Sequence, residues 1–259
     1  MKRIFMYIVA GSVTFLGFIM AFAPASLLYS TVEAELDKVI PEVQLVSMSD
    51  TIWRGNALLR YRGFPDFTLN WRLAATPLMA ANISADIEVA GEGHALSTHL
   101  NLSQAETLIE GLQGKISSSF VNQESETLGL TFTGELELQN INFSADRRWI
   151  TAIDGNLHWT GGKVHYRPDS SADPGYNTPG QIFELPALDG ALSLEGNILL
   201  LNVVYRGASL ILVRLKPDGW AEISVKARLF DLAKVPWPAG SNLDETVLLL
   251  EEQLFRGRG

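Results

Sequence analysis

Apolar and polar residues alternate along most of the chain beyond residue 45. In the segment 67–73, apolar side chains at the odd positions alternate with Thr68, Asn70 and Arg72. Successive side chains of a strand point to opposite faces, so this period indicates antiparallel strands with one dry and one wet face. The chain is therefore predicted to be all-β: mainly an antiparallel meander, arranged as a curved sheet or a sandwich. The same alternation occurs at 83–89, 128–138 and 221–229.

Short turn sequences separate the predicted strands. Lys-Pro-Asp-Gly at 216–219 places proline and glycine where a tight turn favours them. Gly196-Asn197 predicts a two-residue hairpin between the strands on either side of it. Two further stretches, 153–159 and 188–194, both begin with an apolar-Asp-Gly sequence. Either an internal duplication or two similar turns that each start a strand accounts for their similarity.

A third turn, Gly161-Gly162, predicts a hairpin with a defined register. In that register Trp159 faces Val164 and His158 faces His165, so that one face is apolar and the other polar. Two imidazoles opposite each other are close enough to share a metal, but zinc needs three or four protein ligands and no third ligand is identifiable nearby. We therefore interpret both histidines as solvated side chains and expect no metal site.

Two short helices are expected to interrupt the sheet. Each follows a capping-box sequence, in which a residue that accepts free N–H groups comes three residues before a glutamate. The first box is at 103–106 and starts a helix that stops near Gly111, and the second starts a helix over about 242–255. The segment 167–181 is the only long loop, and loops of that length are often functional or mobile.

The first thirty residues contain a long apolar segment. No charged residue occurs from Ile4 to Ala23, and twenty helical residues extend about 30 Å, the thickness of a bilayer's hydrocarbon core. A cleaved signal peptide is the alternative, because Ala21-Phe22-Ala23 resembles a cleavage site. Pro24 would then be the first mature residue. Its ring and missing N–H fit the extended-chain binding site of a protease poorly. We therefore expect an uncleaved transmembrane helix over 4–29.

The charges on the two sides of this segment predict its orientation. Lys2 and Arg3 precede it and the first acidic residue is Glu33, so the N-terminus is expected in the cytoplasm. The predicted location is the inner membrane, single-pass, with the bulk of the chain in the periplasm. The expected divisions are a cytoplasmic tip, a transmembrane anchor, a juxtamembrane segment and a β-rich periplasmic domain, at 1–3, 4–29, 30–44 and 45–259.

Composition excludes several classes of function. The formal charge is −9, from 20 basic and 29 acidic residues, whereas a nucleic-acid partner requires clustered lysine and arginine. The chain has no cysteine, which excludes disulfides, thiolate zinc sites and cysteine nucleophiles. It also has no phosphate-binding glycine loop, dinucleotide motif, nucleophile elbow or metalloprotease motif. We therefore expect no catalytic residue, no cofactor and no small-molecule substrate.

Paired carboxylates and tryptophans are the remaining candidates for chemistry. Glu135 and Glu137 share the polar face of a predicted strand, and Glu251-Glu252 lies in the polar part of a predicted helix. No surrounding residue indicates a shifted pKa, so we interpret both pairs as solvated surface. The six tryptophans could form a platform for sugars, but Trp71 falls on an apolar strand face, which favours core packing.

Several stretches of the sequence resemble one known family. Ser49-Asp50-Thr51-Ile52-Trp53-Arg54-Gly55-Asn56-Ala57, followed by Leu69-Asn70-Trp71-Arg72-Leu73, is similar to the motif of the type II secretion system protein N family. In that motif a Gly-Thr-apolar-Trp-x-Gly-x-Ala turn soon follows a single membrane helix, and Asp50 stands where the family usually has glycine. The segment 155–159 resembles the family's Gly-x-Leu-x-Trp strand, and 219–220 its late Gly-Trp turn. The matching residues, which we expect to be structural, are Thr51, Trp53, Gly55, Trp71, Gly155, Trp159, Gly219 and Trp220.

This resemblance implies an inner-membrane accessory of the machine that exports folded proteins from the periplasm across the outer membrane. It also implies that other type II secretion proteins and inner-membrane lipid are partners, and that the chain is not an enzyme, since the family has no assigned catalytic residues. A second hypothesis is a lipid-handling periplasmic protein similar to the AsmA type, because the apolar face of a strand such as 128–138 could contact acyl chains. No constellation of residues supports a third hypothesis, a periplasmic hydrolase.

Overall fold

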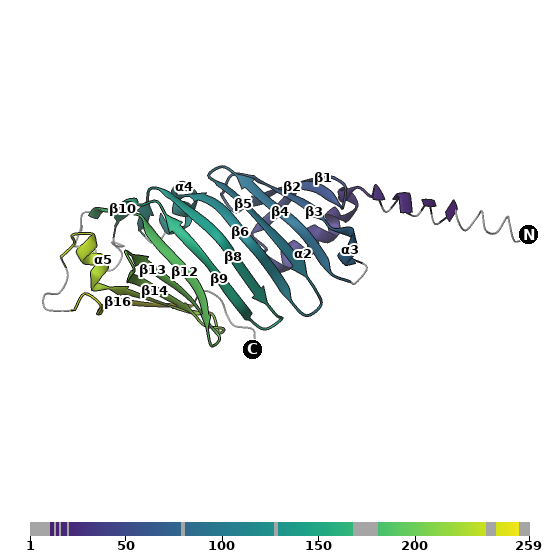
Figure 1. The fold of residues 1–259 in the computed structure, drawn as a ribbon. Helices are drawn as coiled ribbons and strands as arrows, with labels where there is room; N and C mark the ends of the chain where they lie inside the picture. Colours follow the sequence, from purple (N-terminus) through teal and green to yellow (C-terminus); the bar gives the residue numbers. More distant parts are fainter. Residues whose placement is uncertain are drawn as a thin grey trace, which may run out of the picture. The chain divides into compact units, whose positions relative to one another are not determined.

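The computed structural model divides the chain into two compact units, residues 1–91 and 92–259, which are described separately (Figure 1). Within the described part of the chain, no helix is long and apolar enough to cross a membrane. Residues 4–10, 13, 16 and 20 of the expected anchor at 4–29 lie outside the described residues, as does nearly all of the expected loop at 167–181. The structure describes residues 11–12, 14–15, 17–19, 21–78, 81–126, 129–167, 181–236 and 242–253.

The first unit is a four-stranded antiparallel meander with a helix packed on it. Its strands pair in chain order: β1 with β2, β2 with β3, and β3 with β4. The helix α2 packs on the apolar face of β1 and β2, where the Tyr29 hydroxyl donates a hydrogen bond of 2.7 Å to the Leu45 carbonyl. The elements are η1 (Ala25–Leu28), α2 (Tyr29–Val39), β1 (Val43–Asp50), β2 (Arg54–Tyr61), β3 (Phe67–Leu73), α3 (Ala75–Leu78) and β4 (Ile83–Gly91).

The first folded unit includes residues that the sequence analysis assigned to the membrane anchor. Pro24 forms an isolated antiparallel bridge with Thr51, and Ala25 is buried, with 1% of its surface exposed. Residues 24–29 of the expected anchor therefore belong to the folded unit. The expected juxtamembrane segment at 30–44 is mostly helix α2, whose Val32 and Leu36 pack against the core of the sheet.

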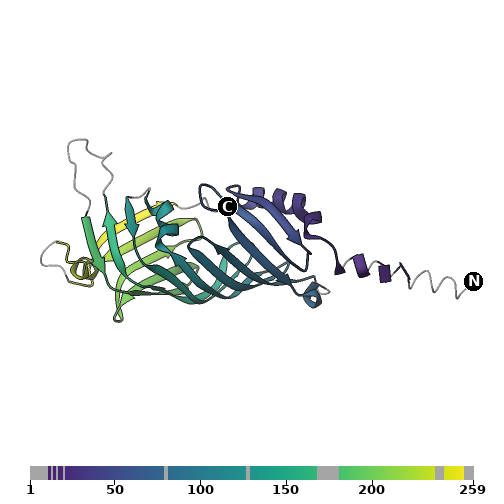
Figure 2. The ribbon, with the colours of Figure 1, turned by 90° about the horizontal axis from the view of Figure 1, so that it is seen from above.

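The second unit contains a large antiparallel sheet and a small one. The order in the large sheet is β5-β6-β8-β9-β12-β13-β14-β15-β16, and in the small sheet it is β11-β10-β7. Figure 2 shows the large sheet curving along this order. The elements are β5 (His94–Leu102), β6 (Thr107–Ser117), α4 (Ser118–Ser125), β7 (Leu130–Phe132), β8 (Glu135–Ala145), β9 (Ile150–Trp159), β10 (Gly162–Tyr166), β11 (Gln181–Leu185), β12 (Leu188–Glu195), β13 (Ile198–Tyr205), β14 (Ala208–Leu215), β15 (Trp220–Lys226), α5 (Ala227–Leu232) and β16 (Thr246–Gln253).

The predicted antiparallel meander is confirmed in both units. The strand predicted at 67–73 is β3, and the one at 83–89 lies within β4. The predicted hairpin at Gly196-Asn197 joins β12 to β13, with Glu195 opposite Ile198. The predicted turn at 216–219 joins β14 to β15, and the Gly219 amide donates to the Lys216 carbonyl at 3.0 Å. In these segments the structure agrees with the strands predicted from the alternation and with the turns predicted from the turn residues.

Two predicted strands are too long. The one at 128–138 is divided between β7 in the small sheet and β8 in the large one, because the chain turns at Gly134, whose φ of 97° favours glycine. The one at 221–229 ends with β15 at Lys226, and helix α5 follows. Alternation alone does not reveal where a chain changes sheets or direction.

Both predicted capping-box helices are wrong. At 103–106 the Ser103 hydroxyl accepts the Ala105 and Glu106 amides, as in a capping box, but the chain continues into strand β6 at Thr107. The same hydrogen bonds close a serine turn, so the motif does not require a helix. The predicted helix at 242–255 is strand β16 in its described part, and β16 pairs along the edge of β15. Backbone pairing with an open sheet edge outweighs the helical spacing of its leucines.

The predicted hairpin at Gly161-Gly162 is also wrong. Strand β9 pairs with β8 and β12, whereas β10 pairs with β7 and β11. The chain leaves the large sheet at Gly161, where a Cβ atom would lie 2.7 Å from the Ala187 backbone nitrogen. Glycine is needed here for close backbone approach between two sheets and not for a two-residue turn.

The two similar stretches at 153–159 and 188–194 lie in neighbouring strands. They fall in β9 and β12, which pair so that Gly190 is opposite Leu157 and Leu192 is opposite Gly155. Both Asp-Gly sequences therefore lie within strands and do not form turns.

Candidate functional site

Four of the eight motif residues lie together at one end of the first sheet, around the turn between β1 and β2. The Thr51 hydroxyl and the Arg54 backbone exchange two hydrogen bonds of 3.2 Å, which close the turn between β1 and β2. The Trp71 indole nitrogen donates a 3.0 Å hydrogen bond to the Ile52 carbonyl in the same turn. Strand β3 is thereby tied to the turn that precedes β2.

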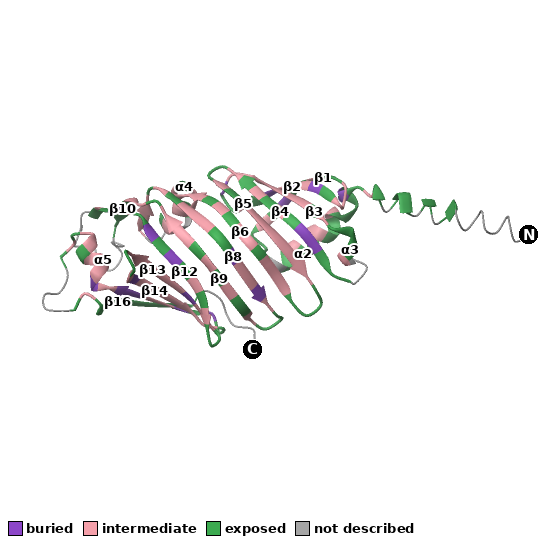
Figure 3. Ribbon diagram, in the orientation of Figure 1, coloured by how far each residue is buried: buried purple, intermediate pink, exposed green. Residues whose placement is uncertain are grey.

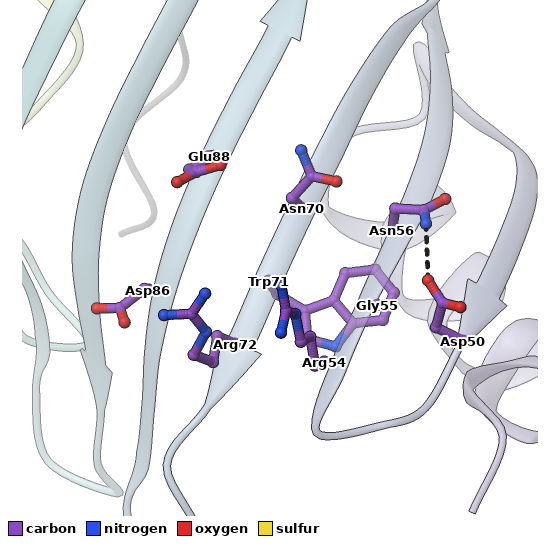
Figure 4. A pocket seen from close by; sticks show the side chains of 9 residues that line it. All are labelled: Asp50, Arg54, Gly55, Asn56, Asn70, Trp71, Arg72, Asp86 and Glu88. Atoms are coloured by element: carbon purple, nitrogen blue, oxygen red, sulfur yellow. Dashed lines mark hydrogen bonds between the residues drawn. The ribbon is translucent and has the colours of Figure 1, made fainter.

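Gly55 is the place where the indole of Trp71 crosses strand β2 (Figure 4). The two residues are directly opposite in the β2–β3 register. A Cβ atom at Gly55 would lie 2.5 Å from Trp71 Cζ2 and 2.6 Å from the Ser49 carbonyl oxygen. Packing of an aromatic ring over a glycine on the neighbouring strand is a known way to stabilise such a glycine. Gly55 and Trp71 therefore act as a complementary pair, while Trp53 contributes its carbonyl to the Leu73 amide at 2.7 Å.

The backbone conformation of Asp50 explains why glycine suits the first position of the motif. Its φ is 66°, in the left-handed region that glycine enters freely and that aspartate tolerates better than most residues. Its carboxylate accepts a 3.0 Å hydrogen bond from the Asn56 side chain, whose amide oxygen accepts another of 2.8 Å from Ser49. The turn is thus retained although aspartate, with its polar side chain, stands in place of glycine.

The face of the first sheet that carries the polar side chains of β2, β3 and β4 holds a pocket of about 380 Å³. Its side chains form two rows across the strands. One row is Arg54, Arg72 and Asp86, and the other is Asn56, Asn70 and Glu88. Neither guanidinium forms an ion pair with another residue that the structure describes. Figure 4 shows Arg72 extending toward Asp86. The residues around the pocket are Asp50, Arg54, Gly55, Asn56, Asn70, Trp71, Arg72, Asp86 and Glu88.

The second pair of motif residues, Gly155 and Trp159, lies on β9 in the other unit. Gly155 has φ 142°, and a Cβ atom there would lie 2.5 Å from Ile141 Cα on β8. The Trp159 indole donates a 3.0 Å hydrogen bond to the Thr133 carbonyl and meets the Phe132 ring edge-on, with 6.1 Å between centroids. Trp159 therefore connects the large sheet to strand β7 of the small one.

The last pair, Gly219 and Trp220, forms the turn between β14 and β15. Gly219 has φ 88°, and the Trp220 amide donates to the Asp218 carboxylate at 3.2 Å. The Trp220 side chain is 42% exposed and borders a shallow pocket of about 260 Å³ that also includes Lys216 and Glu251. Unlike Trp71 and Trp159, Trp220 is largely available to solvent.

The structure separates the two histidines that the predicted hairpin would have paired. His158 is opposite Glu137 and Asp189, and its Nδ1 lies 2.7 Å from an Asp189 carboxylate oxygen, whereas His165 is opposite Thr131 and Ile182 in the small sheet. No cluster of three metal-binding side chains occurs among the residues that the structure describes. The two histidines therefore cannot share one ion.

The glutamates of both pairs lie on strands, where Glu137 is half-buried and the other three are exposed. The Lys115 ammonium lies 2.8 Å from Glu137 and 3.6 Å from Glu135, and its hydrogen bond lowers the pKa of Glu137. Glu251 and Glu252 lie on opposite faces of the edge strand β16, because successive side chains of a strand alternate.

The large sheet also has apolar rows that its core does not cover. Leu192, Leu201, Val213, Ile223 and Leu250 are directly opposite one another on five successive strands, and Leu194, Leu199 and Leu215 form the next row. None of these eight side chains is buried, and Leu250 is 49% exposed. Figure 3 shows that intermediate burial predominates along the strands of the second unit. Alternating leucines at these positions are visible in the sequence, but only the register shows that they are aligned.

A scan against family models matches residues 41–229 to the model of type II secretion system (T2SS) protein N. The chain belongs to this family. A search of curated proteins finds no significant match, and neither does a search of solved structures. The family is a component of a secretion system, so the chain is a type II secretion component.

The matched region contains all the motif residues from Thr51 to Trp220. It begins just before strand β1 and ends within α5, so helix α2 and strand β16 lie outside it. Among the motif residues, Gly55 and Gly155 are positions at which an added Cβ atom would overlap a neighbouring strand.

Proposed function

We propose that this protein is a non-enzymatic component of the type II secretion system, held at the inner membrane by its apolar N-terminal segment. Membership of the protein N family supports the secretion role. The uncharged run from Ile4 to Ala23, with Lys2 and Arg3 before it, supports a single membrane helix with the N-terminus in the cytoplasm. The two compact units would then lie in the periplasm.

The partners in this proposal are other type II secretion proteins. The observation that carries it is the charged pocket beside the Gly55–Trp71 pair, within the region that matches the family. Arg54 and Arg72 have no ion-pair partner among the described residues, and a guanidinium binds a carboxylate through two parallel hydrogen bonds. We therefore propose that an acidic segment of another secretion component binds across β2 and β3.

The absence of enzymatic activity is part of the same proposal. Around the pocket, the carboxylates and guanidiniums belong to exposed residues, and no histidine is among its lining residues to act as a general acid or base. A nucleophile with an adjacent base is not present among its lining residues. A charged surface of this kind suits recognition of a protein partner better than chemistry on a substrate.

Charge reversal at Arg72 tests the proposal. In cells that lack the native gene, the Arg72→Glu variant should reduce both the release of an exported protein into the medium and the recovery of secretion proteins with the full-length chain. Arg60→Glu is the matched control, because Arg60 lies on β2 near the pocket but is paired with Asp66 outside it. Equal secretion and equal recovery for native chain and Arg72→Glu would refute the docking site. If purification of the native chain from membranes recovers no secretion protein, the wider function is refuted.

A further inference from the structure

The apolar rows of the second unit are defined by register. The first row runs through Leu192, Leu201, Val213, Ile223 and Leu250 on β12 to β16, and the second through Leu194, Leu199 and Leu215. We call these eight residues the open rows. On the opposite face of the same strands lie Asn202, Arg214 and Glu222, and the Arg214–Glu222 ion pair has a length of 2.7 Å. One face therefore carries two aliphatic rows, the second of which continues through Ala221 to Glu252, whereas the other face carries these polar residues together with Leu200 and Leu212.

The open rows begin where the core of this unit ends. The core cluster contains Leu188, Leu210 and residues of the small sheet, and Leu229 and Leu232 of α5 pack against it. It reaches Val203 and Ile211, the row next to Leu201 and Val213, and goes no further along the strands. No residue of the open rows belongs to this cluster. The apolar face thus continues from a covered part to a part that no described element covers.

The chemistry of the open rows indicates what covers them. They contain only leucine, isoleucine and valine, so they offer no hydrogen-bonding group to a partner. Centres of protein interfaces are enriched in tyrosine, tryptophan, methionine and arginine, and none of these occurs in either row. A ligand whose surface is hydrocarbon is the best match to such a face.

The dimensions also fit an acyl chain. Strands are spaced about 4.8 Å apart, so the five strands of the first row span about 19 Å. An acyl chain covers half of the hydrocarbon core of a bilayer, or about 15 Å. One chain lying across the strands would therefore contact most of the residues from Leu192 to Leu250.

Charge argues against a second copy of this chain as the occupant. Strand β16 carries Glu251 and Glu252 immediately beside Leu250, and Asp244 and Glu245 precede it. Two copies that joined their open rows at this edge would bring like charges together, which is unfavourable. The net charge of −9 adds to this repulsion.

We propose that the open rows bind the acyl chains of a phospholipid. The core cluster closes one end of the apolar face, and the lipid's hydrocarbon covers the rest, while its headgroup stays in water beyond Leu194 and Leu199. This binding site is independent of the charged pocket in the first unit, and either proposal can fail without the other.

Photo-crosslinking in cells tests the site with the full-length chain. A photoreactive amino acid is placed at Leu201 or Val213, which face the open rows, and the matched controls carry it at Asn202 or Arg214, the next residues along the same strands. We expect irradiation to add a phospholipid mass at Leu201 and Val213, and at least tenfold less at the controls. Resistance of each variant to protease shows that it is folded.

Three outcomes would overturn the proposal. They are crosslinks to a second copy of the chain, crosslinks to another protein in place of lipid, and equal labelling by lipid on both faces. A Leu201→Asp substitution provides a second measurement, because a charge in the first row is incompatible with bound hydrocarbon. It should lower the lipid adduct at Val213 about tenfold or more, whereas Asn202→Asp should leave that adduct unchanged.

Discussion

Replacement of Gly55 by alanine tests whether the Gly55–Trp71 pair determines the structure of the first unit. The added Cβ atom would lie 2.5 Å from Trp71 Cζ2, 2.6 Å from the Ser49 carbonyl oxygen and 2.9 Å from the Thr51 carbonyl oxygen. Ordinary van der Waals contact begins at 3.4 Å. Two of the three atoms belong to backbone, so rotation of the indole alone cannot relieve the overlap.

The magnitude follows from two effects. Overpacking of a well-packed site costs about 1–3 kcal/mol. Displacement of Trp71 also breaks the 3.0 Å hydrogen bond from its indole to Ile52, which is worth about 0.5–1.5 kcal/mol. We therefore expect Gly55→Ala to lower the free energy of opening in the first unit by about 2–4 kcal/mol.

Amide hydrogen exchange on the full-length chain measures this effect unit by unit. Exchange in peptides from β1 to β3 should accelerate about 30- to 1000-fold, while peptides from β12 to β15 should keep their protection. Gly63→Ala is the matched control, because a Cβ atom at Gly63 meets nothing within 4 Å.

The reasoning is refuted if Gly55→Ala changes the opening free energy by no more than about 0.5 kcal/mol relative to Gly63→Ala, the usual limit for neutral surface substitutions. A Gly55→Ala/Trp71→Leu double variant separates the two causes. Removal of the indole relieves its own contact but leaves the carbonyl of Ser49 in place, so the rescue should be partial.

Two further predictions concern single interactions. Trp159→Phe removes the indole hydrogen bond to Thr133 and should destabilise the contact between β9 and β7 by about 1 kcal/mol, measured by exchange in β7 and β10; unchanged protection would contradict it. The second prediction concerns Asp66, whose pKa is lowered mainly by the hydrogen bond from Arg60. Because the folded pKa is the lower one, this pair stabilises the fold above the unfolded pKa of about 4, and the stabilisation is lost as pH falls through the folded value. Asp66→Asn should therefore reduce the acid dependence of the urea midpoint, and an identical pH profile would show that the pair is not linked to folding.

Sequence reasoning succeeded where local signals sufficed. The strand at 67–73 and the hairpin at Gly196-Asn197 agree with the structure because the period of two and the turn chemistry act within a few residues. It failed at 242–255, where apolar residues spaced as in a helix instead pair with β15. It also failed at Gly161-Gly162, because a pair of glycines indicates freedom of the backbone and not which strands it joins.

The candidate site was only partly accessible from the sequence. The motif residues could be recognised by resemblance, but the contact between Gly55 and Trp71 depends on the β2–β3 register. The rows of the charged pocket likewise depend on two registers at once, and no periodicity aligns Arg72 with Asp86. The left-handed φ of Asp50 had one signal in the sequence, since it occupies a position at which the family favours glycine.

The order of strands in the large sheet has a consequence for how the chain acquires its structure during synthesis. From β13 to β16 every strand pairs with the one made just before it, so each can add to a finished edge as it emerges. Two earlier strands of the large sheet are exceptions: β6 pairs with β8, which is made after β7, and β9 pairs with β12, which is made after β10 and β11. The edge of β9 therefore stays unpaired until β12 has been made. The described sheet is complete only when β16 has been added.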